Sequence, residues 1–154
     1  MRGYVRLNST VGAENVKQIV DENDTESLQN LKYTYLDAVR EFCDEKGITL
    51  ILVKTVMADN DINDWNTGLH NQLAQYCDTY GIAFFDFNCE SLQIETGIDP
   101  ACCVAADKRH SNYDGAVRMT DYIGGYLSEE YGLYSRDGYF TKEEMEAFHS
   151  QSAE

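Results

Sequence analysis

Two short apolar runs constrain the fold of this chain more than any other feature of its sequence. They are ITLILVKTV (48–56) and IAFFDFN (82–88), and a glycine precedes each of them. Unbroken apolar stretches of this length, rich in β-branched or aromatic residues, are typical of strands buried on both faces. Such strands occur almost only in parallel sheets covered by helices. The two runs therefore predict an α/β fold.

Amphipathic segments stand before, between and after these runs. Apolar residues recur near a 3.6-residue period over roughly 26–46, 64–80 and 112–131, and Gly47 and Gly81 stand where the first two helices would end. The order helix–strand–helix–strand–helix predicts parallel strands. We expect the residues before the last helix, 89–106, to form a long loop that holds the only proline.

Two strands are too few for a stable parallel sheet, which needs several neighbours and cover on both faces. Further strands would come from the first 24 residues, where GYVRLN is the one candidate, or from outside this sequence. We therefore expect an irregular segment (1–25), an α/β domain (26–132) and a C-terminal turn with a short helix (133–154).

The charge of the chain limits its partners. A formal net charge of −15 argues against a nucleic-acid partner, which needs a basic face, and against an anionic membrane surface. No stretch is long and apolar enough for membrane insertion, and MRGYVRLNST lacks the apolar core of a signal peptide. The compartment is left open by these observations.

The five cysteines do not form a recognisable metal or disulfide pattern. Their number is odd, no Cys-x-x-Cys occurs, and Cys102 and Cys103 are adjacent, so that their side chains would diverge. We interpret all five as free and largely buried thiols. No metal and no organic cofactor is implied by the sequence.

The stretch AADKRHSNYDGAVRMTDYIGGYL (105–127) carries the clearest chemical signal. Asp107 and His110 stand three residues apart in a loop before a helix, and loops of this kind lie at the carboxyl edge of an open α/β sheet, where ligands bind. A carboxylate can fix the tautomer of an imidazole, which then acts as a general base. The alternative is a polar turn that caps the helix through Ser111, Asn112 or Asp114.

This stretch resembles the last conserved block of the SGNH (GDSL-type) hydrolases, in which Asp-x-x-His precedes the final helix. Members from Gram-positive bacteria often show Asp-x-x-His-x-Asn followed by Gly-Ala, as is the case here for Asp107, His110, Asn112, Gly115 and Ala116. The segments YLDAVREFCDEKGITLILVKT and WNTGLHNQLAQYCDTYGIAFFDFN resemble the two preceding units of that family. The resemblance covers roughly residues 30–131.

The resemblance implies a flavodoxin-like three-layer α/β/α fold with an incomplete parallel sheet. It also implies hydrolysis of a small-molecule or carbohydrate ester by a serine nucleophile, without a cofactor. His110 would be the catalytic base, Asp107 its orienting partner, and Asn112 a supporting residue. Many relatives act in the cell envelope or are secreted.

The chain departs from the family where the nucleophile should be. No Gly-Asp-Ser occurs, and the blocks that form the oxyanion hole are not evident. Asn60 in ADND is a candidate oxyanion donor, with Ala58 at the place of the glycine. Ser9 is a hydroxyl without the surrounding signature of a nucleophile. We therefore interpret the chain as the C-terminal portion of such a hydrolase, inactive or poorly active alone.

Two alternatives to that interpretation remain open. The chain could be a non-catalytic α/β interaction domain, or a subunit completed by another chain, and in both cases an open sheet edge would favour association, including self-association. The loops 59–70 and 133–144 each lack part of a calcium ligand set. We expect His70 and His149 to be surface residues rather than ligands.

Overall fold

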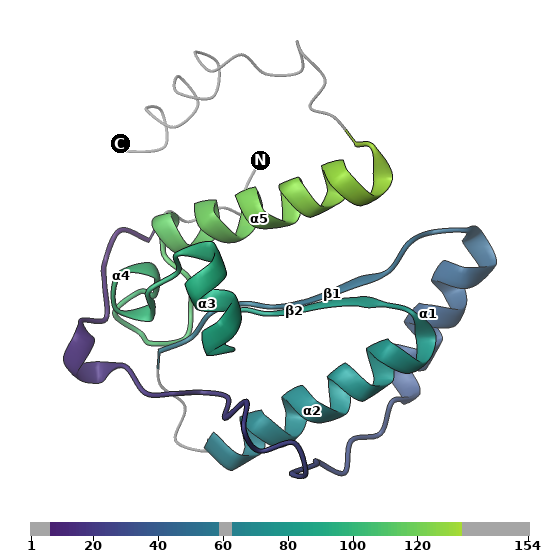
Figure 1. Ribbon diagram of the computed structural model, residues 1–154, viewed down its shortest axis with the longest axis horizontal. Coiled ribbons are helices and arrows are strands. Elements are labelled where there is room, and N and C mark those ends of the chain that lie inside the picture. The colour runs from purple at the N-terminus through teal and green to yellow at the C-terminus, as the bar shows by residue number, and fades with distance from the viewer. Residues whose placement is uncertain (1–6, 59–62, 134–154) are drawn as a thin grey trace. The chain divides into compact units, whose positions relative to one another are not determined.

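The computed structural model describes residues 7–58 and 63–133 of the chain (Figure 1). Along the sequence its elements are η1 (Ala13–Asn15), α1 (Thr34–Lys46), β1 (Ile51–Lys54), α2 (Asn63–Tyr80), β2 (Ala83–Asp86), α3 (Glu90–Thr96), α4 (Pro100–Cys103) and α5 (Tyr113–Tyr131). The chain divides within α5 into two units, residues 1–122 and 123–154.

The strands β1 and β2 form a two-stranded parallel sheet, in which Ile51 lies opposite Ala83 and Lys54 lies opposite Asp86. The predicted α/β fold with parallel strands is confirmed. This is the one sheet within the part of the chain that the structure describes. The finer prediction of a flavodoxin-like three-layer fold stays a prediction.

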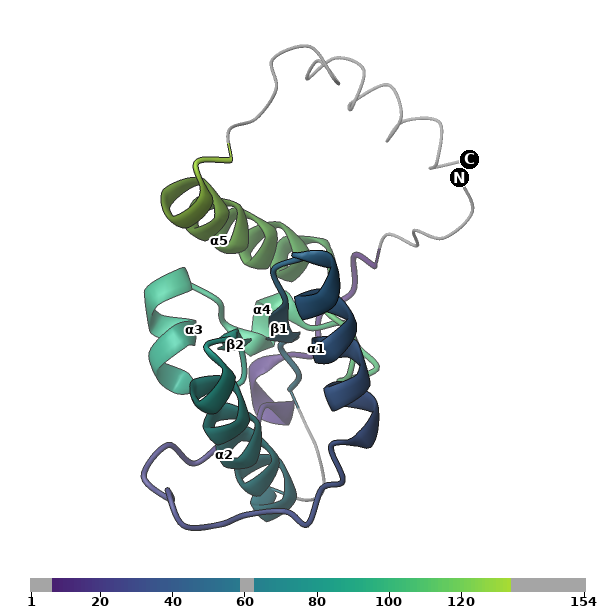
Figure 2. The ribbon, with the colours of Figure 1, turned by 90° about the vertical axis from the view of Figure 1, so that its right-hand side faces the viewer.

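Helices lie against both faces of β2. Successive side chains of a strand point to opposite faces, so the neighbours Phe84 and Phe85 contact different helices. The ring centroid of Phe84 lies 5.6 Å from that of His70 on α2. The ring centroid of Phe85 lies 5.6 Å from that of Tyr122 at the end of the first unit. Helix α2 lies on the lower side of the strands in Figure 1 and in the turned view of Figure 2. Phe84 and Phe85 are therefore covered from opposite sides and half-buried, as a strand between helices should be.

The first helix begins later than predicted. The periodic pattern indicated a helix from about residue 26, but α1 starts at Thr34. The preceding segment is not helical and is hydrogen-bonded to α2. Asn71 donates its amide to the carbonyl oxygens of Asp24 and Ser27, and the hydroxyl of Tyr33 donates to the carbonyl of Gln72. The Ser27 carbonyl is thereby taken from a helical ladder, and the Leu31 N–H donates to the side chain of Gln72 at 3.4 Å instead of to a helical carbonyl.

The predicted long loop at 89–106 is also wrong, because it contains α3 and α4. The first of these ends at Gly97, whose positive φ of 66° is a common helix stop. The second begins at Pro100, where the missing N–H has no intrahelical partner to lose. The Asp99 carboxylate caps it by accepting from the N–H of Ala101 at 2.9 Å. Helices this short show no hydrophobic period to detect.

The best-buried apolar residues lie around the carboxyl end of the sheet. Ile19, Val20 and Cys89 form a buried cluster against which Met57 and Leu92 pack. The N-terminal segment passes through this region as irregular chain and not as a strand. Its backbone reaches two loops, since Val11 N–H donates to the Val104 carbonyl and Lys17 N–H donates to the Ala58 carbonyl.

One face of α1 has no apolar cover in the described part of the chain. Tyr35, Val39 and Phe42 stand one helical turn or two apart on that face, and each is exposed. Ile48 and Val53, before and within β1, are also exposed. We call Tyr35, Val39 and Phe42 the α1 apolar face. A surface of this kind is typical of a place where further chain packs.

The described part of the second unit is the C-terminal half of α5. Within it, the rings of Tyr126 and Tyr131 meet edge to face at 6.0 Å, and Gly132 follows the helix with a positive φ of 61°. No helix in residues 7–58 and 63–133 is long and apolar enough to cross a membrane. Residues 59–62 and 134–154, which include the candidates Asn60 and His149, lie outside the residues that the structure describes.

Candidate functional site

Asp107 and His110 occupy a tight turn between α4 and α5. Val104 and Ser111 form an isolated antiparallel bridge at its base. Within the turn, Ala105 N–H donates to the His110 carbonyl at 2.8 Å, and Lys108 N–H donates to the Ala105 carbonyl at 2.9 Å. Lys108 has a positive φ of 67°, which lets the chain reverse within so few residues. The turn is thus fixed by its own backbone bonds.

The Asp107 carboxylate binds the imidazole directly. Its Oδ2 lies 2.7 Å from Nδ1 of His110, and its Oδ1 accepts from the backbone N–H groups of Arg109 and His110 at 3.0 Å each. Together these bonds lower the pKa of Asp107 to about 2, and the bond from the Arg109 N–H has the largest effect. The two side chains thus lie within hydrogen-bond distance of one another.

The charge of Asp107 decides which nitrogen of His110 carries the proton. An ionised carboxylate can only accept, so Nδ1 of the imidazole must donate its N–H. The lone pair of the neutral ring is then on Nε2. The His110 side chain is 72% exposed, and that of Asp107 is 49% exposed. The pair therefore presents a basic nitrogen toward solvent in the tautomer that a general base needs.

The turn lies at the carboxyl end of the sheet. Ala58, shortly after the end of β1, donates its N–H to the carbonyl of Lys108 at 3.1 Å. Ser9 also lies beside the turn, because its Oγ accepts from the N–H of Ala106 at 3.2 Å. The sequence contains no motif that would have placed Ser9 there. Ligands of open α/β sheets bind at this edge.

Asn112 fastens the turn to its surroundings. Its side chain is buried, and its Oδ1 accepts from the N–H of Gly115 at 3.0 Å, so that it caps α5. Its Nδ2 donates to the carbonyl oxygens of Ser9 and Cys102. Of the three residues that could cap this helix, the structure selects Asn112. The cap and the Asp–His pair coexist, so the two interpretations of this stretch do not exclude one another.

We expect Asn112→Ala to lower the free energy of unfolding by about 2 kcal/mol, from a lost helix cap and two carbonyls left without a donor. Urea denaturation monitored by circular dichroism measures this loss. Asn71→Ala is a suitable comparison, because its amide also bridges two carbonyls but lies away from the turn. Only Asn112→Ala should alter the NMR signals of His110. An effect below about 0.5 kcal/mol, the range of ordinary surface changes, would contradict the assigned role.

We expect Asp107→Asn to change the tautomer of His110. In wild-type protein at mildly alkaline pH, nitrogen NMR of labelled histidine should show a protonated Nδ1 and a bare Nε2 for His110. In the variant the neutral amide no longer requires a donor at Nδ1, and the Nε2–H form should rise. His70 serves as the internal control, since its signals should not move. A wild-type His110 protonated on Nε2 would refute the geometry.

A pH dependence follows from the same bond. The pKa of Asp107 in the folded chain, about 2, lies below the unfolded value of about 3.9. Its contribution to stability is therefore complete above the unfolded value and declines as the pH falls from there toward 2. We expect the difference in unfolding free energy between wild type and Asp107→Asn to shrink over this window, as measured by urea titration. A difference that grows on acidification would contradict it.

A second cluster of polar side chains surrounds Asp86 at the carboxyl end of β2. The Asp86 side chain is fully buried, and its Oδ2 lies 3.2 Å from Nζ of Lys54 and 3.1 Å from Nδ1 of His70. Its Oδ1 accepts from the backbone and side-chain amides of Asn88 at 3.0 and 2.7 Å. Burial alone raises the pKa of Asp86. The bonds from His70 and Asn88 and the charge of Lys54 outweigh burial, so the pKa is lowered.

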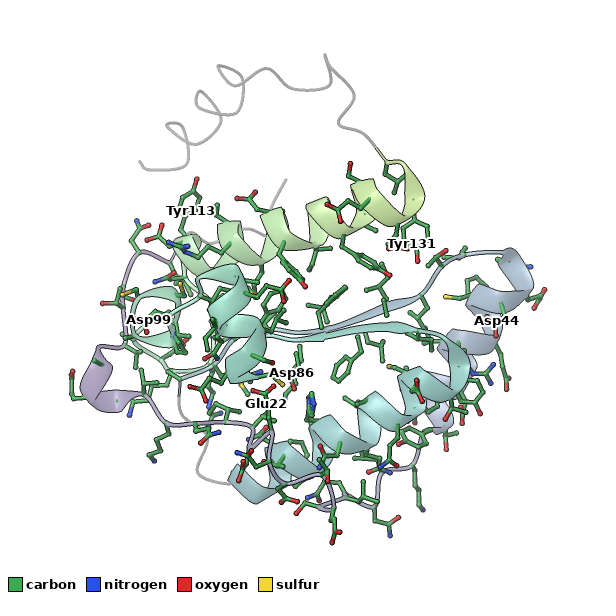
Figure 3. The ribbon with its side chains drawn as sticks, in the orientation of Figure 1. Glu22, Asp44, Asp86, Asp99, Tyr113 and Tyr131 are labelled. Atoms are coloured by element: carbon green, nitrogen blue, oxygen red, sulfur yellow. The ribbon has the colours of Figure 1, made fainter. Side chains whose placement is uncertain are left out.

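Cys89 completes this cluster. Its Sγ lies 3.5 Å from Nδ1 and 3.8 Å from Nε2 of His70. Burial, followed by the negative charges of Asp86 and Glu22, raises the pKa of Cys89 to about 12. Figure 3 shows Asp86 and Glu22 in the region between α2 and the strands. The thiol is therefore protonated at neutral pH.

The cluster does not have the geometry of a Cys–His–Asp nucleophile system. In such a system the acid and the nucleophile bond to different nitrogens of the imidazole. Here Nδ1 of His70 is the nitrogen nearest to both Asp86 and Cys89. A protonated thiol is also a poor nucleophile. The prediction that His70 is a surface residue is wrong, because its ring is half-buried against β2.

The fold and the site define an α/β protein with an Asp–His pair at the carboxyl edge of a parallel sheet. Comparisons of this chain with known protein families, with curated proteins and with solved structures found no match. The resemblance to SGNH hydrolases stays a prediction from the 105–127 stretch and the two units before it.

Proposed function

We propose that this chain is the C-terminal portion of an SGNH-type ester hydrolase and supplies its catalytic base. His110 is the base, and Asp107 orients it and stabilises the imidazolium that forms. The observation that supports this role most directly is the 2.7 Å contact between Nδ1 of His110 and Oδ2 of Asp107 on an exposed imidazole. Asn112 holds the turn in place.

The chemistry follows from the tautomer. Nε2 of His110 takes the proton of a serine hydroxyl as that oxygen attacks the ester carbonyl, and the imidazolium then protonates the departing alkoxide. Water hydrolyses the acyl-serine by the same proton transfers in reverse order. The substrate class is a small-molecule or carbohydrate ester. Asn60, the candidate oxyanion donor, remains a prediction.

The nucleophile is proposed to come from outside this sequence. The chain has no Gly-Asp-Ser, and Ser9, which lies beside the turn, accepts from Ala106 rather than forming a sharp nucleophile turn. The two-stranded sheet and the α1 apolar face both leave surface for further strands to cover. Strands that carry the serine would therefore complete the sheet and the site together.

The α1 apolar face favours a second candidate function. A domain that kept the α/β core without a nucleophile could bind a separate chain through this face, as an interaction domain or a complementing subunit. In that case, the serine would be absent or supplied in trans. If this candidate is correct, the reading frame upstream of Met1 does not encode a Gly-Asp-Ser block.

Extending the reading frame upstream of Met1 distinguishes these proposals. We expect an in-frame Gly-Asp-Ser upstream, and an extended protein that hydrolyses p-nitrophenyl acetate. His110→Ala should abolish this activity, whereas His70→Ala should leave most of it. The 154-residue chain alone should not hydrolyse the ester. An upstream frame without Gly-Asp-Ser, or an extended enzyme indifferent to His110→Ala, would refute the proposed fragment.

A further inference from the structure

We propose that His70, Asp86 and Cys89 form a binding site for one zinc-type divalent cation at the carboxyl end of β2. One ligand atom from each side chain is available, and these three atoms all lie within 4.8 Å of one another. An imidazole nitrogen, a carboxylate oxygen and a thiolate sulfur are the three donor types that zinc accepts. The inference does not depend on the proposed hydrolase function.

The three donors are held by rigid parts of the fold. Asp86 is the last residue of β2, and Cys89 follows in a tight turn that its own N–H closes by donating to the Asp86 carbonyl at 3.1 Å. His70 faces them from α2, and its ring lies against Phe84 of the same strand. Sites built on helices and strands keep their geometry better than sites on loops.

A second layer of bonds orients the carboxylate. Oδ1 of Asp86 accepts two bonds from Asn88, and the amide of Asn88 is itself fixed by the backbone of Thr55 and Met57. Oδ2 therefore remains as the oxygen that faces His70. Bonds of this kind to a ligating carboxylate are typical of metal sites.

The local charge fits a dication. When a metal binds, the Cys89 thiol gives its proton to solvent and a sulfur–metal bond replaces the S–H bond. Nδ1 of His70 donates to Asp86 without the metal, so its proton moves to Nε2 and the freed lone pair binds the metal. The two resulting negative charges, on Asp86 and Cys89, are neutralised by one dication. At Cys89 the positive charge of Lys54 opposes the negative charge of Glu22. Without the metal, Lys54 is the cation at Oδ2, 3.2 Å away.

Lys54 does not exclude the metal. A carboxylate oxygen has two lone pairs, so Oδ2 can bind a metal on one side and accept from Nζ on the other. Three protein ligands leave the fourth position of a tetrahedral zinc site for water.

Cobalt binding tests the site. The metal-free chain, prepared with a chelator in a Cys102→Ser background that removes the exposed thiol, is titrated with Co²⁺. We expect one equivalent to bind with tetrahedral visible bands and a thiolate-to-cobalt charge-transfer band. Cys89→Ser should lose the charge-transfer band, and His70→Gln should weaken binding at least about tenfold. Cys77→Ala, which removes another buried thiol, should retain both the charge-transfer band and the binding affinity.

Thermal melts provide a second readout that does not depend on a spectrum. Zinc should raise the melting temperature of the parent and of Cys77→Ala but not of Cys89→Ser, with circular dichroism confirming that each variant is folded without metal. No cobalt band in the parent, a band that survives Cys89→Ser, or a zinc shift equal in all variants would overturn the proposal. The cluster would then be an ion-pair network only.

Discussion

Asp86→Ala is expected to lower the free energy of unfolding by about 3–5 kcal/mol, because it removes one partner of a buried ion pair. The substitution removes the carboxylate that lies 3.2 Å from Nζ of Lys54, and the Lys54 side chain, only 16% exposed, is left without this partner. The amide of Asn88 loses the acceptor that it contacts at 2.7 Å. Urea denaturation in the presence of a chelator measures the loss without a contribution from metal.

Two comparison variants isolate the buried pair. Asp78→Ala, an exposed aspartate on α2, should change stability by less than about 0.5 kcal/mol. The double variant Lys54→Met, Asp86→Leu should cost less than Asp86→Ala alone, since apolar replacement of both partners leaves no buried charge uncompensated. A double variant that is as unstable as Asp86→Ala would show that packing, rather than charge, holds this region.

Gly115→Ala is expected to destabilise the chain by about 2–3 kcal/mol through overpacking. A Cβ atom at this position would lie 2.2 Å from the carbonyl oxygen of Cys103, which is backbone and cannot rotate away. The same carbonyl accepts from the N–H of Asn112 at 3.0 Å. The start of α5 would have to move off this carbonyl, and the bonds that fix the Asp107–His110 turn would loosen with it.

Gly124→Ala is the matched control for this prediction. Gly124 lies in the same helix, and a Cβ there meets no atom within 4 Å among the described residues. Alanine should stabilise a helix by about 1 kcal/mol at such a position. Opposite signs for the two variants, measured by thermal and urea unfolding, would establish the close approach at Gly115. A stabilising Gly115→Ala would contradict it.

The parts of the fold that the sequence predicted are those with a strong periodic signal. The runs 48–56 and 82–88 became β1 and β2, and the long amphipathic segments became α1, α2 and α5. Both strands are shorter than their runs, because pairing in the described sheet covers four residues of each. Hydrophobicity indicates that a segment is buried, but the hydrogen-bond partner decides where a strand ends.

The errors in the prediction have physical causes. Residues 26–33 carry apolar residues at helical spacing, yet the Ser27 carbonyl and the Leu31 N–H bond to side chains of α2. A local pattern cannot show this contact. The helix α3 is seven residues long, too short for a period to be detected. Asp107 and His110 were found because a motif places them three residues apart.

The cluster at β2 was missed for a different reason. His70 is separated from Asp86 by 16 residues, and only the packing of α2 on the strand brings them together. One signal was present in the sequence: a charged residue, Asp86, interrupts the apolar run 82–88 that predicted a buried strand. A buried carboxylate requires a partner, and Lys54 stands at the matching place in the preceding strand.

Labelling with a fluorophosphonate, read by intact mass, tests the assignment of His110 as the base of a serine hydrolase most directly. We expect no adduct on the 154-residue chain, one adduct on the protein extended upstream through a Gly-Asp-Ser block, and none on that protein carrying His110→Ala. An adduct on the 154-residue chain that disappears in His110→Ala would place the nucleophile within this sequence, with Ser9 as the first residue to replace. Labelling of the extended protein that persists in His110→Ala would contradict the role of His110.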